Sequence, residues 1–363
     1  MFIITNRIVH EAQTDVENVF GSTPAPGPNT LRLADANKIN GTWHISVLPD
    51  IIPPQQAAAQ AISSSSADNV VYASDYVAAK LLAKLVPAAG VTASGRNLLL
   101  YVHGYNNDVA AVLNRAAQLE IDFNVEVLVF SWPANGGGSA YGLASYKSDK
   151  RDALASVGAL SRLLERMAQL LEHAHADYVE KISKLADSKH KNDAAAWDEF
   201  FSHHMAQRCK FTVNLMLHSM GNYLFKHLMT SSVYSIDKLL FDNIIMVAAD
   251  TNNEAHAQWV DRIPYRNRLY ITINENDSAL KASRLKMGEH QKARLGHFLK
   301  RLEAKMATYV NFTDQPHIGS SHAYFEGKAL QNNKVHAFFM TVFNGGTAEQ
   351  KLKYDPARNL YHF

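Results

Sequence analysis

Short apolar runs alternate with longer amphipathic segments from residue 97 onward, and this alternation constrains the fold more than any other feature of the chain. The run at 97–102 is almost continuously apolar, which is typical of a strand buried on both faces. Strands separated by helices need right-handed crossovers and form a mostly parallel sheet with helices on both faces. The sequence therefore predicts an α/β fold. Further runs of this kind lie at residues 125–130, 211–217, 243–249, 268–273 and 308–312.

Residues 1–92 have a different texture. Apolar and polar side chains alternate along 42–48, which is the pattern of a half-buried strand, and 2–9 also reads as a strand. Three prolines within 23–28 predict a loop between them, because proline fixes φ and donates no amide hydrogen bond. We therefore predict a β-rich extension over 1–92 with Pro- and Ser-rich connections, followed by a main domain over 93–363. The extension holds no candidate for catalysis, so we expect it to lie outside the catalytic machinery.

Three helical features stand out in the main domain. A long amphipathic helix is predicted over 156–185, and helix resumes over 194–207 after a charged break. We interpret 178–207 as a helical insertion that either covers a site or packs on the sheet. A basic helix is predicted over 282–306, where Lys and Arg predominate. We expect a solvated helix face there, with steering of an anionic substrate as the alternative.

Composition and charge exclude several classes of function. The chain holds 36 Lys and Arg against 34 Asp and Glu, which is too balanced for a nucleic-acid-binding protein. The single cysteine, Cys209, excludes a disulfide framework and a four-cysteine zinc site. No apolar run approaches the roughly 18–20 residues of a membrane span, and the first residues make a poor signal peptide. We therefore expect a cytoplasmic protein without stable membrane insertion. No metal-binding or nucleotide-binding motif is present, so no metal and no cofactor is expected.

Ser219 is the candidate nucleophile. An apolar strand leads into this serine and a helical pattern follows it, which predicts a nucleophile elbow. In such a turn the hydroxyl is exposed and the amide of Met220 is directed at the forming oxyanion. Gly221 is expected because a side chain there would collide with a neighbouring element. Leu217 replaces the glycine usually found two residues before the serine, and a buried helix-capping serine is the alternative interpretation.

A second short motif follows the strand at 97–102. His103 and Gly104 end that strand, and glycine allows a backbone amide to turn toward a site. The amide of Gly104 or of Tyr105 is therefore expected to be the other oxyanion donor. An ordinary glycine turn with a surface histidine is the alternative.

Four short motifs occur in a fixed order along the chain, and together they resemble the bacterial α/β-hydrolases of the domain of unknown function 900 group. The resemblance covers about residues 97–324. It implies an α/β-hydrolase fold and a catalytic triad in the chain order serine, acid, histidine. The motifs are His103-Gly104-Tyr105-Asn106, Phe130-Ser131-Trp132-Pro133, His218-Ser219-Met220-Gly221-Asn222 and Ala248-Ala249-Asp250.

Two aspartates compete for the role of the acid. In α/β-hydrolases the acid usually follows the second strand after the elbow, which favours Asp277, and we expect its strand to lie next to the strand that precedes the base. Asp250 follows the first strand after the elbow. It is the alternative acid, or it caps a helix that opens near Glu254.

Two histidines compete for the role of the base after the strand at 308–312. His322 lies in a loop rich in Gly and Ser, from which a side chain can reach across the site. His317 follows Pro316, where the backbone is more restricted. We favour His322.

The predicted function is that of a serine hydrolase acting on a small-molecule or lipid-like acyl substrate. Ser219 attacks a carbonyl, His322 takes its proton and Asp277 orients His322. Esterase or lipase-like chemistry is favoured over thioesterase or peptidase chemistry by analogy of fold alone. A non-catalytic interaction module of the same fold is the alternative from another class. The sequence does not determine the acyl chain, the leaving group or the oligomeric state.

Overall fold

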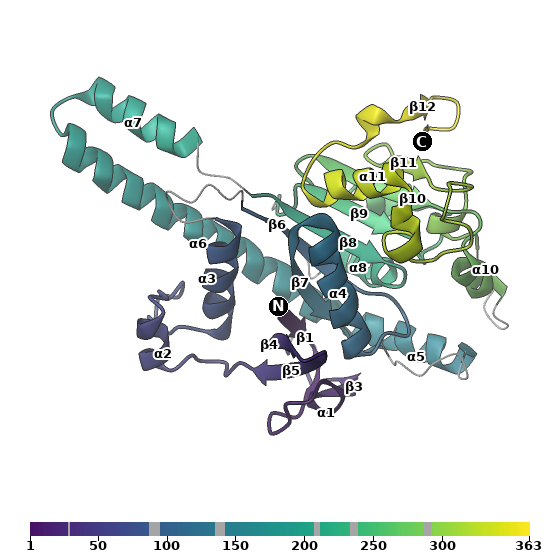
Figure 1. Ribbon diagram of the computed structural model, residues 1–363, viewed down its shortest axis with the longest axis horizontal. Helices are drawn as coiled ribbons and strands as arrows, with labels where there is room; N and C mark the ends of the chain where they lie inside the picture. The colour runs from purple at the N-terminus through teal and green to yellow at the C-terminus, as the bar shows by residue number, and fades with distance from the viewer. Residues whose placement is uncertain (28–29, 87–94, 135–141, 207–210, 233–238, 286–291) are drawn as a thin grey trace. The chain divides into compact units, whose positions relative to one another are not determined.

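The structure is a computed structural model, and contacts divide its chain into two compact units (Figure 1). The first unit comprises Met1–Leu48, Asn97–Arg162 and Val213–Phe363, and the second comprises Pro49–Arg96 and Leu163–Thr212. The residues described are 1–27, 30–86, 95–134, 142–206, 211–232, 239–285 and 292–363. Cys209 lies outside them.

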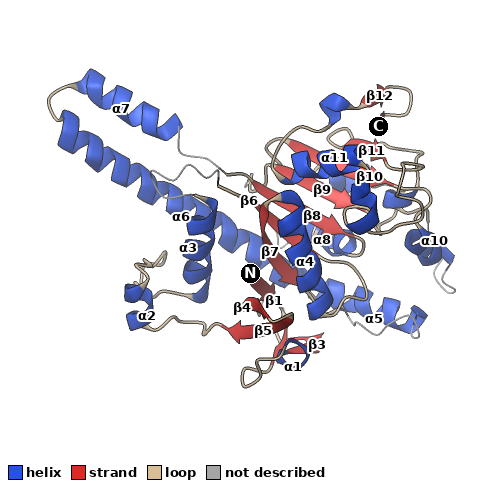
Figure 2. Ribbon diagram, viewed as in Figure 1, coloured by secondary structure: helices blue, strands red, loops and turns tan. Residues whose placement is uncertain are grey.

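The first unit is built on a large, mostly parallel sheet (Figure 2). Its strands are β1 (Phe2–Thr5), β4 (Arg32–Ile39), β5 (Thr42–Val47), β6 (Asn97–Val102), β7 (Val125–Ser131), β8 (Val213–His218), β9 (Asn243–Val247), β10 (Arg268–Ile273), β11 (Thr308–Asn311), β12 (Lys353–Asp355) and β13 (Leu360–His362). Their order in the sheet is β12-β13-β11-β10-β9-β8-β6-β7-β1-β4-β5. The predicted α/β class and its mostly parallel sheet are therefore confirmed.

The start of the chain lies inside this sheet. β1 pairs in parallel with β7, and β4 and β5 continue the sheet in antiparallel fashion. All four residues of β1 are buried. Their side chains, Phe, Ile, Ile and Thr, alternate between the two faces of the sheet, as expected of a strand covered on both sides. The β-rich start predicted for the chain is confirmed by these strands. Residues 1–48 share a unit with the strands that follow residue 97, whereas residues 49–92 belong to the second unit. β2 (Arg7–Val9) and β3 (Phe20–Pro24) form a small antiparallel sheet of their own.

Helices cover both faces of the large sheet. α1 (Val16–Val19), α4 (Val109–Phe123) and α11 (Asn333–Phe343) lie on one face, and α8 (Gly221–Thr230) lies on the other, together with α5 (Gly142–Ala155) and α9 (Ala257–Val260) (Figure 2). Phe123 of α4 contacts Phe339 and Phe343 of α11 at ring-centroid distances of 6.3 and 4.9 Å. These rings belong to a buried cluster that also includes inward-facing residues of β6, β7, β8 and β9. The loops that follow the carboxyl ends of the parallel strands carry the site.

The second unit is helical. It contains α2 (Pro54–Ala59), α3 (Ala73–Leu85), α7 (Ala194–Ala206) and most of α6 (Val157–His190). Arg166 of α6 pairs with the buried Asp75 of α3 at 3.0 Å. Trp197 of α7 donates to Asp187 of α6 at 2.8 Å and so closes a helical hairpin. The helices predicted over 156–185 and 194–207 correspond to α6 and α7. No helix among the described residues is both long and apolar enough to cross a membrane.

The basic helix predicted over 282–306 is wrong. α10 (Ser278–Leu285) ends early, residues 286–291 lie outside the described part, and η2 (Leu295–His297) is the only helical turn described between 292 and 307. The amide of Gly296 donates to Ala249, and its carbonyl accepts from Asn274, each at 3.0 Å. A Cβ on Gly296 would lie 2.2 Å from the nitrogen of Ala249. The segment thus bonds to the ends of β9 and β10 instead of to itself. Two more short turns follow, η3 (Gly327–Gln331) and η4 (Glu349–Lys351).

Candidate active site

The backbone at Ser219 has the strained geometry of a sharp strand-to-helix turn. Ser219 follows β8 directly and has a φ of 54°, a region that non-glycine residues seldom adopt. Its amide donates to Val247 at 3.0 Å, and its carbonyl accepts from the amide of Asn222 at 3.1 Å. A Cβ on Gly221 would lie 2.7 Å from the carbonyl oxygen of Val102, so α8 begins in close contact with the end of β6. Such strain costs about 1–3 kcal/mol and is typical of functional sites.

Asn222 holds this turn in place with its side chain. Its Nδ2 donates to the carbonyls of Leu217 and Ser219 at 3.0 and 3.1 Å, and the residue is fully buried. The sequence motif includes Asn222 but does not predict what its side chain does. An asparagine in the first turn of a predicted helix could have indicated this role, because its side-chain amide readily bonds to nearby backbone groups.

Gly104 lies directly against the serine. A Cβ on Gly104 would lie 2.6 Å from Cβ of Ser219 and 3.2 Å from its Oγ, so no other residue fits without moving the turn. Among the described residues, the amides of Gly104 and Met220 have no hydrogen-bond acceptor. Two unengaged amides next to a serine hydroxyl are the groups that an oxyanion requires. Tyr105 follows Gly104 and makes interactions of its own.

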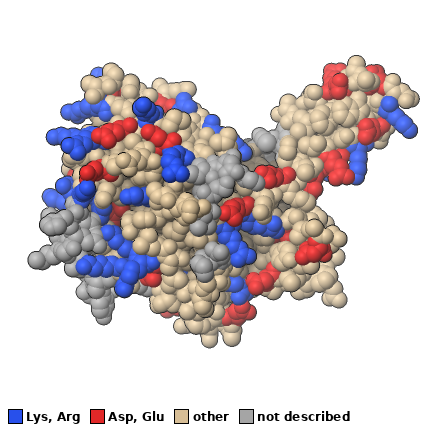
Figure 3. All heavy atoms as spheres, turned by 180° about the vertical axis from the view of Figure 1, so that it is seen from behind, with Lys and Arg blue, Asp and Glu red and all other residues tan. Residues whose placement is uncertain are grey.

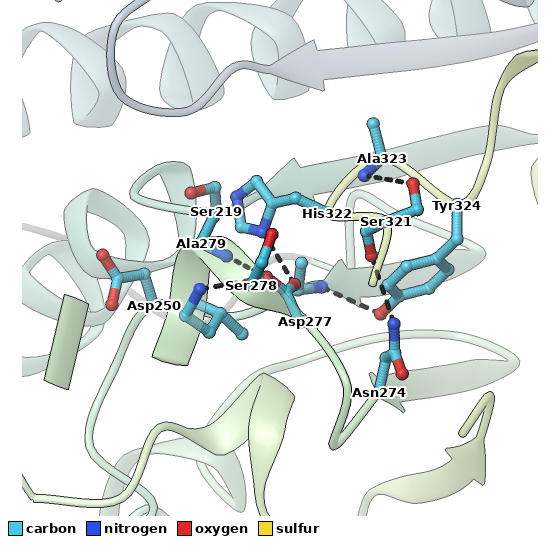
Figure 4. Close-up of polar contacts among 12 residues, drawn as sticks. Ser219, Asp250, Asn274, Asp277, Ser278, Ala279, Ser321, His322, Ala323 and Tyr324 are labelled. Atoms are coloured by element: carbon cyan, nitrogen blue, oxygen red, sulfur yellow. Dashed lines mark hydrogen bonds and ion pairs between the residues drawn. The ribbon is translucent and has the colours of Figure 1, made fainter. Parts of the chain in front are cut away.

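His322 and Asp277 form a short, buried pair. Nδ1 of His322 lies 2.7 Å from Oδ2 of Asp277, whose side chain is fully buried, while the His322 side chain is 24% exposed. Oδ1 of Asp277 accepts the amides of Ala279 and Leu280, each at 2.9 Å, at the start of α10. Figure 4 shows the imidazole between Asp277 and Ser219, with its other nitrogen on the side of the serine. Both carboxylate oxygens of Asp277 are therefore engaged, one by the imidazole and the other by backbone amides.

The loops that carry Asp277 and His322 are bonded to each other. β10 pairs in parallel with β11, which confirms that the strand before Asp277 lies next to the strand that precedes His322. Asn274 donates to the carbonyls of Gly319 and Ser321 at 3.0 and 3.2 Å. These contacts hold the backbone of the loop that carries His322 and so position its imidazole.

The competing residues lie elsewhere. Asp250 forms an ion pair with Arg294 at 2.9 Å, and both side chains are 4% exposed. It also accepts from Ser283 and Tyr146, each at 2.9 Å, and it caps no described helix, since α9 begins after His256. His317 is exposed and makes no polar contact within the described residues. The geometry thus groups Ser219, His322 and Asp277, and it assigns Asp250 to a buried ion pair.

Two further histidines near the serine are buried and neutral. His103 stacks on Trp132 with a centroid distance of 5.3 Å and an interplanar angle of 4°, and burial lowers its pKa to about 3. Burial also lowers the pKa of His218 well below the ordinary value, and its Nε2 lies 3.2 Å from the carbonyl oxygen of His322. His218 therefore donates to the backbone carbonyl of His322, and neither ring carries charge at neutral pH.

Arg7 links the start of the chain to this site. Its Nη2 donates to the carbonyls of Trp132 and Ala134 at 2.8 and 3.2 Å, and its Nε donates to Ser131 at 3.2 Å. Burial lowers its pKa to about 10, so the guanidinium remains charged at neutral pH. Arg7 therefore supports the loop after β7, and the expectation that residues 1–92 lie outside the catalytic machinery stays a prediction. In the sequence, only the position of a single arginine at the end of an apolar strand pattern indicates a buried, functional contact for Arg7.

Arg115 and Glu326 connect the loop after β6 to the loop that carries His322. Arg115 of α4 forms two bonds of 2.8 Å to the carboxylate of Glu326 and one of 3.2 Å to Asn107. Asn107 in turn donates to the carbonyls of Tyr105 and Gly104 at 2.7 and 3.2 Å. A bidentate arginine–carboxylate pair is rigid, so it couples the positions of the two loops.

The sheet order, the strained serine and the loops at the carboxyl ends of the strands define an α/β-hydrolase fold. A family model described as an alpha/beta hydrolase of unknown function (DUF900) matches residues 89–191 and 174–342. The chain belongs to this family, and the resemblance drawn from the four motifs is confirmed. No curated protein and no solved structure matches the chain. Membership supports a hydrolase. No group of three or more His, Cys, Asp or Glu side chains within the described ranges is arranged to hold a metal ion.

Proposed function

We propose that the protein is a serine hydrolase that cleaves an ester-type acyl bond through Ser219, His322 and Asp277. The observation that carries the proposal is the 2.7 Å contact between Nδ1 of His322 and Oδ2 of Asp277. A carboxylate in that position holds the imidazole in the tautomer that leaves Nε2 free to accept a proton. Asp250 is engaged with Arg294 and cannot take this role without breaking a buried ion pair.

The proposed reaction proceeds through an acyl-enzyme. Oγ of Ser219 attacks the carbonyl carbon while Nε2 of His322 takes the hydroxyl proton, and Asp277 stabilises the imidazolium that forms. The imidazolium then returns the proton to the leaving group. Water attacks the acyl-enzyme with the same histidine as base, and the acid product departs.

The oxyanion of each tetrahedral intermediate is assigned to backbone amides. The amide of Met220 is one donor, and the amide of Gly104 or Tyr105 is the other. Each such donor contributes about 3–4 kcal/mol to transition-state stabilisation in comparable sites. The close approach of Gly104 to Ser219 supports this assignment.

The substrate class that we propose is a small-molecule or lipid-like acyl ester, with thioesters and amides as the alternatives for the same three residues. Ester chemistry is favoured because an alcohol leaving group needs less assistance from the general acid than an amine does. A panel of acyl esters of increasing chain length, followed by the matched thioesters, separates these classes.

Covalent labelling with a fluorophosphonate tests the proposal. The folded protein is expected to take up one phosphonyl group, and Ser219→Ala is expected to take up none. Ser202→Ala, at an exposed position of α7, is the matched control and should label like the unmodified protein. Equal labelling of Ser219→Ala would contradict the proposal. A folded protein that neither labels nor hydrolyses any ester would favour the non-catalytic interaction module.

A further inference from the structure

The residue immediately before the candidate nucleophile sends its side chain to the loop that carries His322. His218 is the last residue of β8, pairs with Val247 of β9 and is 3% exposed. Its Nε2 lies 3.2 Å from the backbone carbonyl oxygen of His322. Within the described residues this is the one hydrogen bond to the backbone of His322. One side chain thus joins the strand that leads into Ser219 to the backbone of His322.

The acceptor determines the tautomer of the His218 ring. A carbonyl oxygen only accepts, so Nε2 carries the hydrogen and Nδ1 is the bare nitrogen. Nδ1 is buried and has no hydrogen-bond partner among the described residues. A second proton on the ring would therefore have no acceptor, and burial lowers the pKa of His218 well below its ordinary value. The ring is a neutral donor to His322 at neutral pH.

Aromatic contacts hold the ring of His218 in the orientation that this bond requires. Its centroid lies 5.1 Å from that of Phe325, with an interplanar angle of 73°, and 4.9 Å from that of the His322 ring. Phe325 is fully buried, and the guanidinium of Arg115 lies 5.8 Å from its ring centroid. Edge-to-face ring pairs are favourable beyond the area that they bury. Packing therefore orients the donor before the bond forms, which lowers the entropy cost of keeping it.

Two other anchors of the same loop come from the region of β10. Asn274, just after β10, donates to the carbonyl of Ser321 at 3.2 Å. Thr272, within β10, contacts the hydroxyl of Tyr324 at 2.7 Å. These anchors hold the loop against the strand that precedes the candidate acid. His218 differs because it reaches the loop from β8, the strand that leads into the candidate nucleophile.

The contact made by His218 is neutral and buried, unlike the charges of the surface. Figure 3 shows Lys and Arg side chains among Asp and Glu side chains over the face seen from behind. Interactions between such exposed charges are screened by salt. A hydrogen bond between a neutral ring and a backbone carbonyl in the interior is not, so its effect should be the same at low and at high ionic strength.

We infer that His218 is a positioning residue, which holds the backbone of His322 at a fixed distance from Ser219 so that the imidazole of His322 can take the hydroxyl proton. This inference rests on the proposed function, because it takes Ser219 as the nucleophile and His322 as the base. Proton transfer depends steeply on this geometry, and a displacement of about 1 Å costs on the order of a hundredfold in rate. His218 itself touches no reacting atom.

Steady-state hydrolysis of p-nitrophenyl butyrate by the full-length protein tests the role of the donor. His218→Phe keeps a ring at this position and removes the hydrogen bond. Its kcat is expected to fall by about 10–100-fold at low and at high ionic strength, while KM changes less than about twofold, because the contact serves proton transfer and not substrate binding. His218→Gln again places an N–H near the carbonyl and is expected to recover most of the loss. His218→Met, which also lacks a donor, gives the same comparison if His218→Phe does not fold.

His336→Phe is the matched control for these variants. Nε2 of His336, on α11, donates to the carbonyl of Asp122 at 3.0 Å, and its ring stacks on that of Phe123 at 5.5 Å. The substitution therefore removes the same kind of bond at a distant position, and kcat should stay within about twofold of the unmodified protein. An unchanged kcat in His218→Phe, an equal loss in His218→Phe and His218→Gln, or a loss confined to KM overturns the inference.

Hydrogen exchange of the backbone amides tests the anchor without requiring turnover. Exchange in residues 318–326 is expected to be about 2–10-fold faster in His218→Phe and to return toward its original rate in His218→Gln, while exchange in β4 and β5 stays unchanged. Unchanged exchange in residues 318–326 overturns the inference. Faster exchange there, in a protein whose unmodified form hydrolyses no ester, contradicts the proposed function and leaves the anchor supported.

Discussion

Two neighbouring strands, β9 and β10, each lead into a buried aspartate at the same edge of the sheet, yet the two carboxylates have different partners. Asp277 contacts the ring of His322 and the first amides of α10. Asp250 contacts the guanidinium of Arg294. The first partner is a partly exposed imidazole, whereas the second is a buried guanidinium.

The difference shows that burial at the end of a strand does not determine the role of a carboxylate. Within the described residues, the carboxylate of Asp277 is bound, apart from His322, only by backbone amides. Asp250 neutralises a permanent cation and, through Tyr146, joins α5 to the loop that follows β9. We therefore expect substitutions at Asp277 to affect turnover and substitutions at Asp250 to affect stability. The following predictions test that separation.

The largest effect on activity is expected from His322→Ala. This substitution removes the imidazole that Asp277 contacts and Asp250 does not. The kcat/KM for an acyl ester should fall by about 10⁴-fold or more, because members of a triad act as a unit. His317→Ala is the matched control and should retain most of the activity, since His317 is exposed and makes no polar contact within the described residues. Turnover by His322→Ala close to that of the unmodified protein would remove this histidine from the mechanism.

Asp277→Asn is expected to lower kcat by about 10³–10⁴-fold with little change in the free energy of unfolding. The amide oxygen can still accept from Ala279 and Leu280, but the NH₂ group faces Nδ1 of His322 and favours the wrong tautomer. Steady-state kinetics and urea denaturation on the same preparations measure the two quantities. If Asp250→Asn instead caused the larger loss of turnover, the assignment of the acid would be reversed.

Asp250→Asn is expected to lower the free energy of unfolding by about 3–5 kcal/mol, because Arg294 would keep a buried charge without its partner. The double variant Asp250→Asn with Arg294→Met removes both charges and should recover part of the loss. Urea denaturation of the single and double variants measures the coupling. Additive losses would show that the pair contributes nothing as a pair.

The smallest effect concerns a histidine that has no carboxylate partner. Burial holds the pKa of His103 at about 3 in the folded protein, below its ordinary value of 6.5. The unfolded chain therefore binds the extra proton between these values, and stability is lost as the pH falls below about 6.5. Each pH unit within that window should remove up to about 1.4 kcal/mol. His103→Gln should show a shallower loss in denaturation curves recorded between pH 4 and 7, and an unchanged slope would show that His103 is not the group responsible.

Local pattern predicted much of the fold. The bounds predicted for the strands at 97–102 and 268–273 agree with β6 and β10, and the serine turn lies where an apolar strand meets a helical pattern. These features are local, because burial on both faces and the periods of strand and helix are written in consecutive residues. The choice of Asp277 over Asp250 came from the resemblance, because in α/β-hydrolases the acid usually follows the second strand after the elbow.

The pattern failed where distant segments compete for the same backbone. A basic, periodic stretch at 282–306 predicted a helix, yet Gly296 is held between the ends of β9 and β10 by backbone bonds that exclude helix. The strand β1 reads as part of an extension, although it pairs with β7 across more than a hundred residues. Helix propensity is a weak preference that such tertiary contacts override.

The sequence by itself determined the α/β class, the serine at its turn and the short set of residues from which an acid and a base can be drawn. Only the tertiary structure decided that Asp277 contacts His322 and that Asp250 contacts Arg294. It also brought Arg7 to the loop after β7. The physical reason is that periodicity encodes which side chains are buried, whereas the partner of a buried charge depends on which distant loops meet at the edge of the sheet.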